Sequence, residues 1–262
     1  MKSRYVFAGI VTIALVLVSI ALLQVVSADN PGGSDKTWDG EGGNLDWGTA
    51  ANWSPDGVPG TSNKVYLNAG AGVTISSGDQ SITWLHSDRP ITISGGSLTL
   101  AQDSAIESSL ALSSDLAGTG NLTISGLFTW SGGQLRGSGS TTANGGISIT
   151  GTGSKQLWDR TLNNGNNGTC TYDGSNFGLY LSSFNNQAGA TFNLPTDGTI
   201  GTIAGGTFNN SGTFNRTTTS GTATIQVVFN NSGTVNVQSG TLRPETNAGP
   251  TPACSTCHRG PY

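Results

Sequence analysis

Phe208-Asn209-Asn210-Ser211-Gly212-Thr213-Phe214 and Phe229-Asn230-Asn231-Ser232-Gly233-Thr234-Val235 are two copies of one pattern. The same beginning occurs at Phe184-Asn185-Asn186, and Leu162-Asn163-Asn164 is interpreted as an earlier copy. Self-similarity at a fixed interval is typical of repeat architectures, in which each copy is one structural unit stacked on the next. The repeat therefore predicts a fold built from stacked copies of one unit.

A second apolar position follows each Asn pair. Successive copies of this position are 22, 22 and 21 residues apart: Cys170, Phe192, Phe214 and Val235. Steps of 21 or 22 residues toward the N-terminus give four further expected positions: Ile149, Phe128, Ile106 and Trp84. The spacing predicts a lattice of inward-facing residues along most of the chain, with Cys170 as a buried core thiol.

Short alternating strands accompany the repeat. Six apolar-polar-apolar segments have the period of two that half-buried strands show: residues 65–67, 73–75, 91–93, 98–100, 122–124 and 147–149. Several strands per 22 residues predict an all-β fold, a right-handed parallel β-helix (solenoid) of about eight coils. Phe192 and Phe214 are expected inside, and the Asn pairs at turns, where Asn tolerates a left-handed backbone. A β-sandwich is the alternative, but it does not require identical residues at this interval.

A Trp-rich segment precedes the repeats, with Trp38, Trp47 and Trp53. The first coil of a solenoid has an unpaired edge and an open core, which bulky aromatic residues can cover. Residues 37–60 are therefore predicted to be an N-terminal cap on repeats that span residues 61–243. The alternative is that the three indoles form an exposed platform on which carbohydrate stacks.

The N-terminus is interpreted as an export sequence. Lys2 and Arg4 precede an apolar run that ends in small residues at Ser27 and Ala28, the layout of a secretory signal. The run is also long enough to span a bilayer. Residues 1–28 are predicted to be a signal peptide or an N-terminal membrane anchor, followed by a linker over residues 29–36. Either reading places the remaining chain outside the cytoplasm, in the periplasm or at the cell surface.

Composition and charge restrict the partners. The chain has 40 Gly, 10% charged residues and a net charge of −4. A nucleic-acid partner would need a basic patch, so none is expected. Contact with membrane is expected only through residues 5–28, if they are retained. The remaining partner classes are glycan, extracellular matrix and cell-surface protein.

The sequence also resembles a family of bacterial surface proteins. Residues 38–53, which contain Trp-Asp-Gly and Trp-Gly-Thr-Ala-Ala-Asn-Trp, and residues 122–135 are similar to β-helix repeats of autotransporter passengers and related adhesins. The resemblance covers most of residues 37–242 and implies a β-helix at the cell surface. It carries no catalytic motif. The chain departs from an autotransporter because the sequence contains no translocator barrel.

Catalysis is not expected. β-Helix glycan-cleaving enzymes need clustered carboxylates, and Asp173 and Asp197, 24 residues apart, project near one another on a 22-residue coil as a weak candidate site. Both are interpreted as turn residues. His86 is the only histidine of the repeat region, so a nucleophile would lack a base. A carbohydrate-active enzyme remains the weakest of the functional hypotheses.

The C-terminal region, residues 244–262, is predicted to be a flexible tail with one specific motif. Cys254-Ser255-Thr256-Cys257-His258 has the Cys-x-x-Cys-His spacing of c-type haem attachment. In such a motif the two thiols bond covalently to the haem and the His is an axial iron ligand. A local disulfide is the alternative. The main hypothesis is thus a structural or adhesive surface solenoid, and the second is a haem-carrying electron-transfer protein, or the front part of one, with the solenoid as scaffold.

Overall fold

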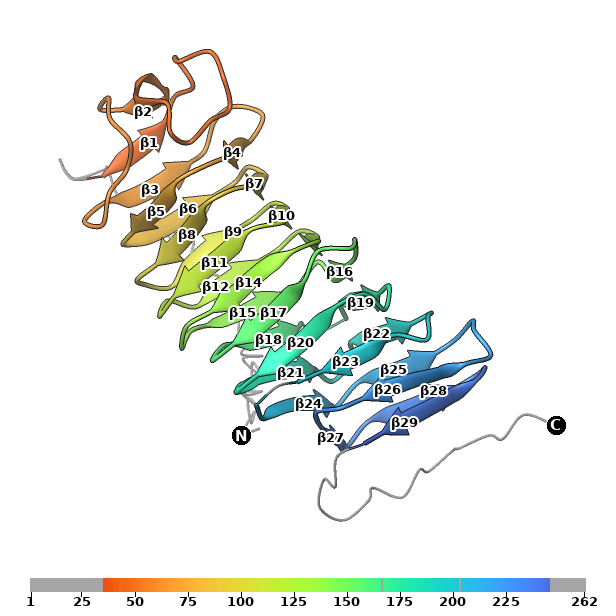
Figure 1. Cartoon of the computed structure of the whole chain (residues 1–262). Helices are drawn as coiled ribbons and strands as arrows, with labels where there is room; N and C mark the ends of the chain where they lie inside the picture. Colours follow the sequence, from red (N-terminus) through yellow and green to blue (C-terminus); the bar gives the residue numbers. More distant parts are fainter. Residues whose placement is uncertain (1–34, 166, 203, 246–262) are drawn as a thin grey trace, which may run out of the picture.

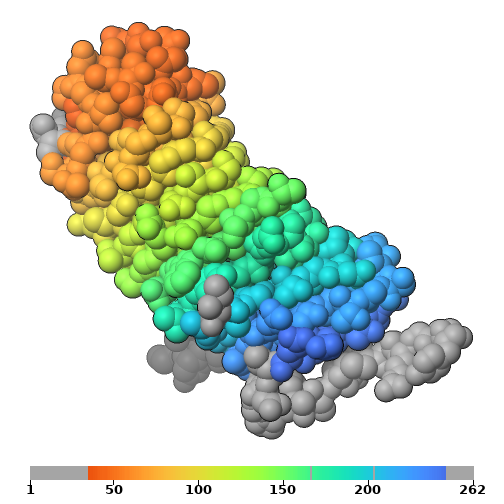
Figure 2. All heavy atoms as spheres, in the orientation of Figure 1, coloured from red at the N-terminus to blue at the C-terminus, as the bar shows by residue number. Residues whose placement is uncertain are grey.

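The protein is a parallel β-solenoid. The computed structural model describes residues 35–165, 167–202 and 204–245. The chain passes through three sheets in turn, and successive passes stack along a rod (Figure 1). Figure 2 shows that the coils follow one another along the rod in chain order. The predicted all-β parallel β-helix is confirmed, with nine coils in place of about eight.

The three sheets are named A, B and C in the order in which the chain enters them. Sheet A contains β1 (Lys36–Trp38), β2 (Trp53–Ser54), β3 (Lys64–Leu67), β6 (Trp84–Ser87), β9 (Ser104–Ile106), β12 (Leu122–Ile124), β15 (Ser140–Ala143), β18 (Thr161–Asn164), β21 (Ser182–Asn186), β24 (Gly206–Asn210) and β27 (Val228–Asn231). Sheet B contains β4 (Val73–Ile75), β7 (Ile91–Ile93), β10 (Leu110–Leu112), β13 (Phe128–Trp130), β16 (Ile147–Ile149), β19 (Thr169–Tyr172), β22 (Thr191–Leu194), β25 (Thr213–Arg216) and β28 (Thr234–Val237). Sheet C contains β5 (Asp79–Ile82), β8 (Ser97–Leu100), β11 (Asp115–Gly118), β14 (Gly133–Arg136), β17 (Lys155–Trp158), β20 (Phe177–Tyr180), β23 (Thr199–Gly201), β26 (Thr222–Ile225) and β29 (Thr241–Pro244).

Helix is almost absent from the described part of the chain. Its single helical element is the 3₁₀ turn η1 (Ala50–Asn52). No helix among the described residues has the length and apolar character needed to cross a membrane. The predicted signal or anchor at residues 1–28 lies outside the described residues.

Apolar and polar residues alternate along the strands, and the apolar residues form the core. All six predicted segments lie in strands, and the two apolar residues of each are buried. The N-terminal coils fill the core with Ile, Leu and Val, and the C-terminal coils fill it with Phe. Phe184 stacks on Phe208 at a centroid distance of 4.8 Å, and Phe192 stacks on Phe214 at 5.0 Å. The predicted inward positions of Phe192, Phe214 and Cys170 are confirmed, because all three are fully buried.

Three of the four positions predicted toward the N-terminus are buried, namely Ile149, Phe128 and Ile106, whereas Trp84 points outward. Only Phe128 belongs to the same register ladder as Cys170, so the predicted 21–22-residue step is wrong for the other three. Cys170 pairs with Ile147 rather than Ile149, while Phe128 is a correct member of the ladder. Ile106 and Trp84 belong to sheet A, and the sheet B ladder continues through Leu110 and Ile91 instead. The reason is that the N-terminal coils are shorter. The corner from sheet B to sheet C is residues 131–132 after β13 but residues 150–154 after β16.

The Asn pairs lie at the ends of strands rather than in turns, which corrects the prediction. The inner ladder of Asn164, Asn186 and Asn210 is buried in the sheet A corner. Each inner amide donates to the next, at 2.9 Å from Asn164 to Asn186 and 2.7 Å from Asn186 to Asn210. An outer ladder through Asn185 and Asn209 donates in the opposite direction, at 2.8 Å. The repeated Asn pair therefore joins coils by side-chain hydrogen bonds, and none of these residues has a positive φ.

The Trp-rich segment covers the first coil. β1 pairs in parallel with β3 and antiparallel with β2. Trp38, Trp47 and Trp53 are at most 1% exposed, and the Trp53 indole N–H donates to the Trp47 carbonyl at 2.8 Å. The alternative of a carbohydrate platform in this segment is wrong, because stacking requires an accessible ring face. β1 begins at Lys36, the last residue of the predicted linker.

Candidate functional site

The outer surface of sheet C carries an organised set of side chains. Inward Leu135, Leu157 and Leu179 are fully buried, so their neighbours along the strands point outward. We call these outward residues from β11 to Gln226, just after β26, the sheet C face. Strand register arranges it in two columns along the rod. One column contains Ala117, Arg136, Trp158 and Tyr180, and the other contains Gln134, Gln156, Gly178, Gly201 and Gln226.

An aromatic pair lies at the centre of the sheet C face. Trp158 and Tyr180 are register partners on β17 and β20. Their rings stack with centroids 4.5 Å apart and an interplanar angle of 18°. The Trp158 indole N–H donates to the Gln156 amide oxygen at 3.1 Å, and Gln134 donates to the same oxygen at 2.9 Å. These bonds hold the indole against a polar row of amides.

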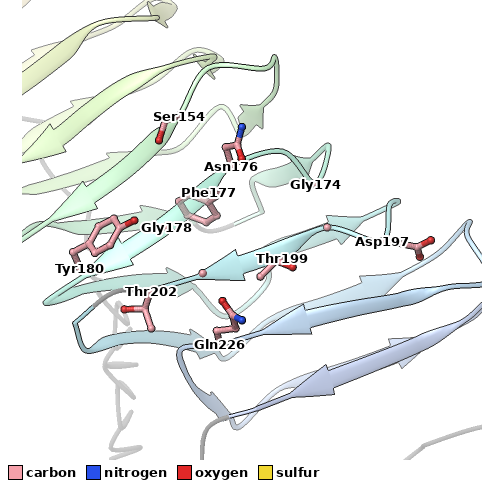
Figure 3. A pocket seen from close by; sticks show the side chains of 12 residues that line it. Ser154, Gly174, Asn176, Phe177, Gly178, Tyr180, Asp197, Thr199, Thr202 and Gln226 are labelled. Carbon is pink, nitrogen blue, oxygen red and sulfur yellow. The ribbon is translucent and has the colours of Figure 1, made fainter.

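A hollow lies on each side of the aromatic pair. The first, which we call the Trp158 hollow, has a volume of about 530 Å³ and is lined by residues of β11, β14 and β17, including Ala117, Arg136 and Trp158. The second, the Gly178 hollow, has a volume of about 460 Å³ and is lined by Gly178, Gly201 and other residues of later coils. Figure 3 shows Thr199 and Gln226 beside it. Both volumes fall within the range of small-ligand sites.

Glycine creates the second hollow. A Cβ at Gly201 would meet only the Gln226 amide oxygen at 3.5 Å and the Phe177 carbonyl at 3.7 Å, which is ordinary contact. A Cβ at Gly178 would lie 2.7 Å from the Tyr180 hydroxyl. The Tyr180 ring therefore lies over Gly178 (Figure 3). The ring fills the space over Gly178, so the open part of this glycine trough lies over Gly201, between the Tyr180 ring and Gln226.

The corners after two of these strands have a left-handed backbone. Asp159 follows Trp158 with φ of 50°, and Leu181 follows Tyr180 with φ of 49°. Gly137 fills the equivalent position one coil earlier with φ of 94°. A residue with a side chain is less stable in this conformation by about 1–2 kcal/mol. Leu181 is also 64% exposed, so local strain and an exposed apolar side chain both occur beside the aromatic pair.

Asp173 and Asp197 lie at adjacent corners, since Gly174 lies against Gly198. Their carboxylates bind different partners, however. Asp173 accepts from the Gly151 N–H at 2.8 Å and from the Ser175 hydroxyl at 2.7 Å. Desolvation raises the pKa of Asp173, but its several hydrogen bonds together lower that pKa below its ordinary value.

Asp197 is paired with a buried arginine side chain. Its carboxylate accepts hydrogen bonds from Arg216, whose side chain is fully buried, and from the Thr219 hydroxyl. Asp197 also lines the Gly178 hollow, and Asp173 is not among the residues that line it. The structure thus gives each aspartate its own set of corner hydrogen bonds.

The predicted haem residues Cys254, Cys257 and His258 lie outside the described residues, so attachment stays a prediction. Within the described part of the chain, no group of three His, Cys, Asp or Glu residues could hold a metal ion. His86 lies on sheet A, 3.2 Å from Asp88. The buried Cys170 is the free cysteine there, and burial raises the pKa of its thiol well above the ordinary value.

Sequence reasoning missed the sheet C face. Lys155-Gln156-Leu157-Trp158 and Phe177-Gly178-Leu179-Tyr180 place their aromatic residues 22 positions apart. An inward leucine before each aromatic residue would have assigned both rings to the outer surface. The pair occurs in only two coils, so it gives no repeat of the kind that marks the Phe and Asn positions.

No protein-family model, curated protein or solved structure matches the chain. The resemblance to autotransporter passengers and adhesins therefore rests on the sequence pattern alone.

Proposed function

We propose that this protein is an exported, non-catalytic adhesive solenoid that binds glycan at the cell surface or in the extracellular matrix. The observation that carries the proposal is the Trp158–Tyr180 pair, which stacks on the outer surface between two hollows. The N-terminal sequence supports export. The solenoid acts as the rigid scaffold that holds the sheet C face in position.

Carbohydrate is the ligand class whose chemistry fits this surface. A sugar ring has an apolar face that packs on aromatic side chains and hydroxyl groups that need donors and acceptors at its edge. The sheet C face offers both within two adjacent columns: the half-buried Trp158 indole, which is backed by Tyr180 at 8% exposure, and the amides of Gln134, Gln156 and Gln226. The amides, carboxylates and hydroxyls that line the two hollows offer a glycan hydrogen-bonding partners that a lipid-like ligand would not use.

Replacement of Trp158 by alanine is expected to weaken glycan binding at least tenfold, since a central aromatic residue contributes about 2 kcal/mol or more at a binding surface. The full chain, after export, is tested on an array of immobilised linear polysaccharides and extracellular-matrix glycans. Affinity for each glycan that binds is then measured by calorimetry with wild type and Trp158→Ala.

Trp84→Ala is the matched control, because Trp84 is a half-buried outward indole on sheet A. It should bind as wild type does. Far-UV circular dichroism verifies that both variants keep the fold. The proposal is contradicted if wild type binds no glycan on the array, or if Trp158→Ala and Trp84→Ala lose affinity equally.

A second candidate, an electron-transfer protein with covalent haem, is favoured by the Cys254-x-x-Cys257-His258 spacing. Protein coexpressed with the haem-attachment machinery is expected to give a c-type pyridine haemochrome spectrum that Cys254→Ala abolishes. The buried Cys170 serves as the control position, because Cys170→Ala should leave the spectrum unchanged. A wild-type spectrum without haem bands would eliminate this candidate.

A further inference from the structure

The geometry points to a specific ligand class and orientation: we infer that the sheet C face binds a neutral, linear polysaccharide lengthwise, parallel to the rod axis. This inference rests on the proposed function and narrows it. It predicts that several consecutive sugar units contact successive coils, in place of one terminal sugar in one pocket.

The order of the two hollows supports the lengthwise orientation. The Trp158 hollow is lined from β11, β14 and β17, and the Gly178 hollow is lined mainly from β20, β23 and the residues around them. They therefore follow one another from coil to coil with the aromatic pair between them, the first at the ends of the sheet C strands and the second toward the starts of those strands. Six strands at a spacing of ~4.8 Å give a face ~24 Å long, which is longer than any single sugar.

The polar groups repeat in the same direction. Gln134, Gln156, Gly178 and Gly201 are register neighbours on successive coils, and Gln226 follows one residue beyond the Ile200–Ile225 pair. An amide thus lies on each side of the glycine trough. A chain laid along this column meets donors and acceptors at both ends, the Tyr180 ring over Gly178 and open space over Gly201.

The charges of the face favour a neutral ligand. Arg136 lies 3.5 Å from Asp115, and Arg216 is paired with Asp197. Asp159 lines the Trp158 hollow as well. Two arginines therefore lie among three aspartates, and each arginine has an aspartate beside it. A polyanionic chain would be repelled by the one remaining negative charge.

Length dependence tests the inference. Neutral β-linked gluco-, manno- and xylo-oligosaccharides, from disaccharide to octasaccharide, are titrated into the full chain, with oligogalacturonides as the acidic series. For the neutral series that binds, the octasaccharide should bind at least about tenfold more tightly than the disaccharide. Oligogalacturonides of the same length should bind more weakly than that neutral octasaccharide.

A variant that closes the trough gives the second readout. Gly201→Gln has room for its Cβ, and its side chain would occupy the centre of the trough. It should lower octasaccharide affinity about tenfold and leave disaccharide affinity nearly unchanged. Thr207→Gln places the same side chain on an outward position of sheet A and should change neither affinity.

The outcomes separate this inference from the proposed function. Equal affinity for disaccharide and octasaccharide, or array binding confined to acidic glycans, overturns the inference and leaves glycan adhesion standing. Octasaccharide binding that Gly201→Gln does not weaken also overturns it. The absence of binding to every glycan on the array overturns both.

Discussion

Replacement of Phe208 by alanine is expected to lower the free energy of unfolding by about 3–5 kcal/mol, the usual loss for a large aromatic residue in a packed core. The Phe208 ring is fully buried. It stacks on Phe184 at 4.8 Å and meets Phe192 edge-on at 4.9 Å. The substitution removes contacts that link three consecutive coils and leaves a cavity between them. Urea denaturation of the full chain, followed by far-UV circular dichroism, measures the change.

Phe229→Ala is the matched control for this prediction. Phe229 is the same residue type one coil later, but it is 8% exposed and, in the described part of the chain, packs against rings on one side only. Its loss should be smaller. Equal losses for the two variants, or a loss below about 1 kcal/mol for Phe208→Ala, would contradict the stacked Phe core.

Replacement of Arg160 by methionine is expected to lower the free energy of unfolding by about 3 kcal/mol or more, because carbonyl groups would be left buried without donors. The Arg160 side chain is buried and donates to the carbonyls of Gly118, Gly120 and Ser140, each at 3.0 Å. It also donates to the Thr141 hydroxyl at 2.9 Å. The guanidinium thus joins three coils.

The charge of Arg160 is retained at neutral pH. Burial lowers its pKa to about 10, still well above 7, so the donors remain in place. Arg243→Met provides the control, since Arg243 is 64% exposed and its loss should stay within about 0.5–1 kcal/mol. The same denaturation experiment applies to both. An Arg160→Met protein as stable as Arg243→Met would show that the buried guanidinium does not hold the coils together.

The solenoid itself could be predicted because identical residues recur where coils stack. Phe184, Phe208 and Phe229 are register partners on β21, β24 and β27, and their spacing in the sequence is the length of a coil. The N-terminal coils offered no such marker. Ile91, Leu110 and Ile147 lie in sheet B, but strands of sheets A and C alternate apolar and polar residues in the same way. Apolar character alone therefore could not assign a residue to a sheet.

The role of the Asn pairs was also hidden from the sequence. Asn is frequent in turns because its short amide tolerates a left-handed backbone. In this fold the position of the Asn pairs depends on a different property: each stacked amide can donate one hydrogen bond and accept another along the axis. The burial of Asn186 follows from the bonds that it makes to Asn164 and Asn210, and these bonds exist only once the coils are in register.

The residues that meet at the candidate site are determined by coil length and strand register, and the sequence pattern predicted these only for the C-terminal coils. Trp158 and Tyr180 meet because β17 and β20 pair without an offset. The Gly178 hollow requires Gly178 and Gly201 at outward positions and the longer corners of the C-terminal coils. A glycine in a strand is often interpreted as a weak point. Here the missing side chain opens the hollow in which we propose that a glycan lies.

Footprinting of the glycan complex tests the central claim, that sheet C of this solenoid is the ligand-binding face. Hydrogen–deuterium exchange of the full chain is compared with and without a neutral polysaccharide selected from the array. We predict added protection in peptides that cover β14, β17, β20 and β23, with sheet A and sheet B unchanged. Protection confined to sheet A or sheet B, in a complex that is demonstrably formed, would contradict the account.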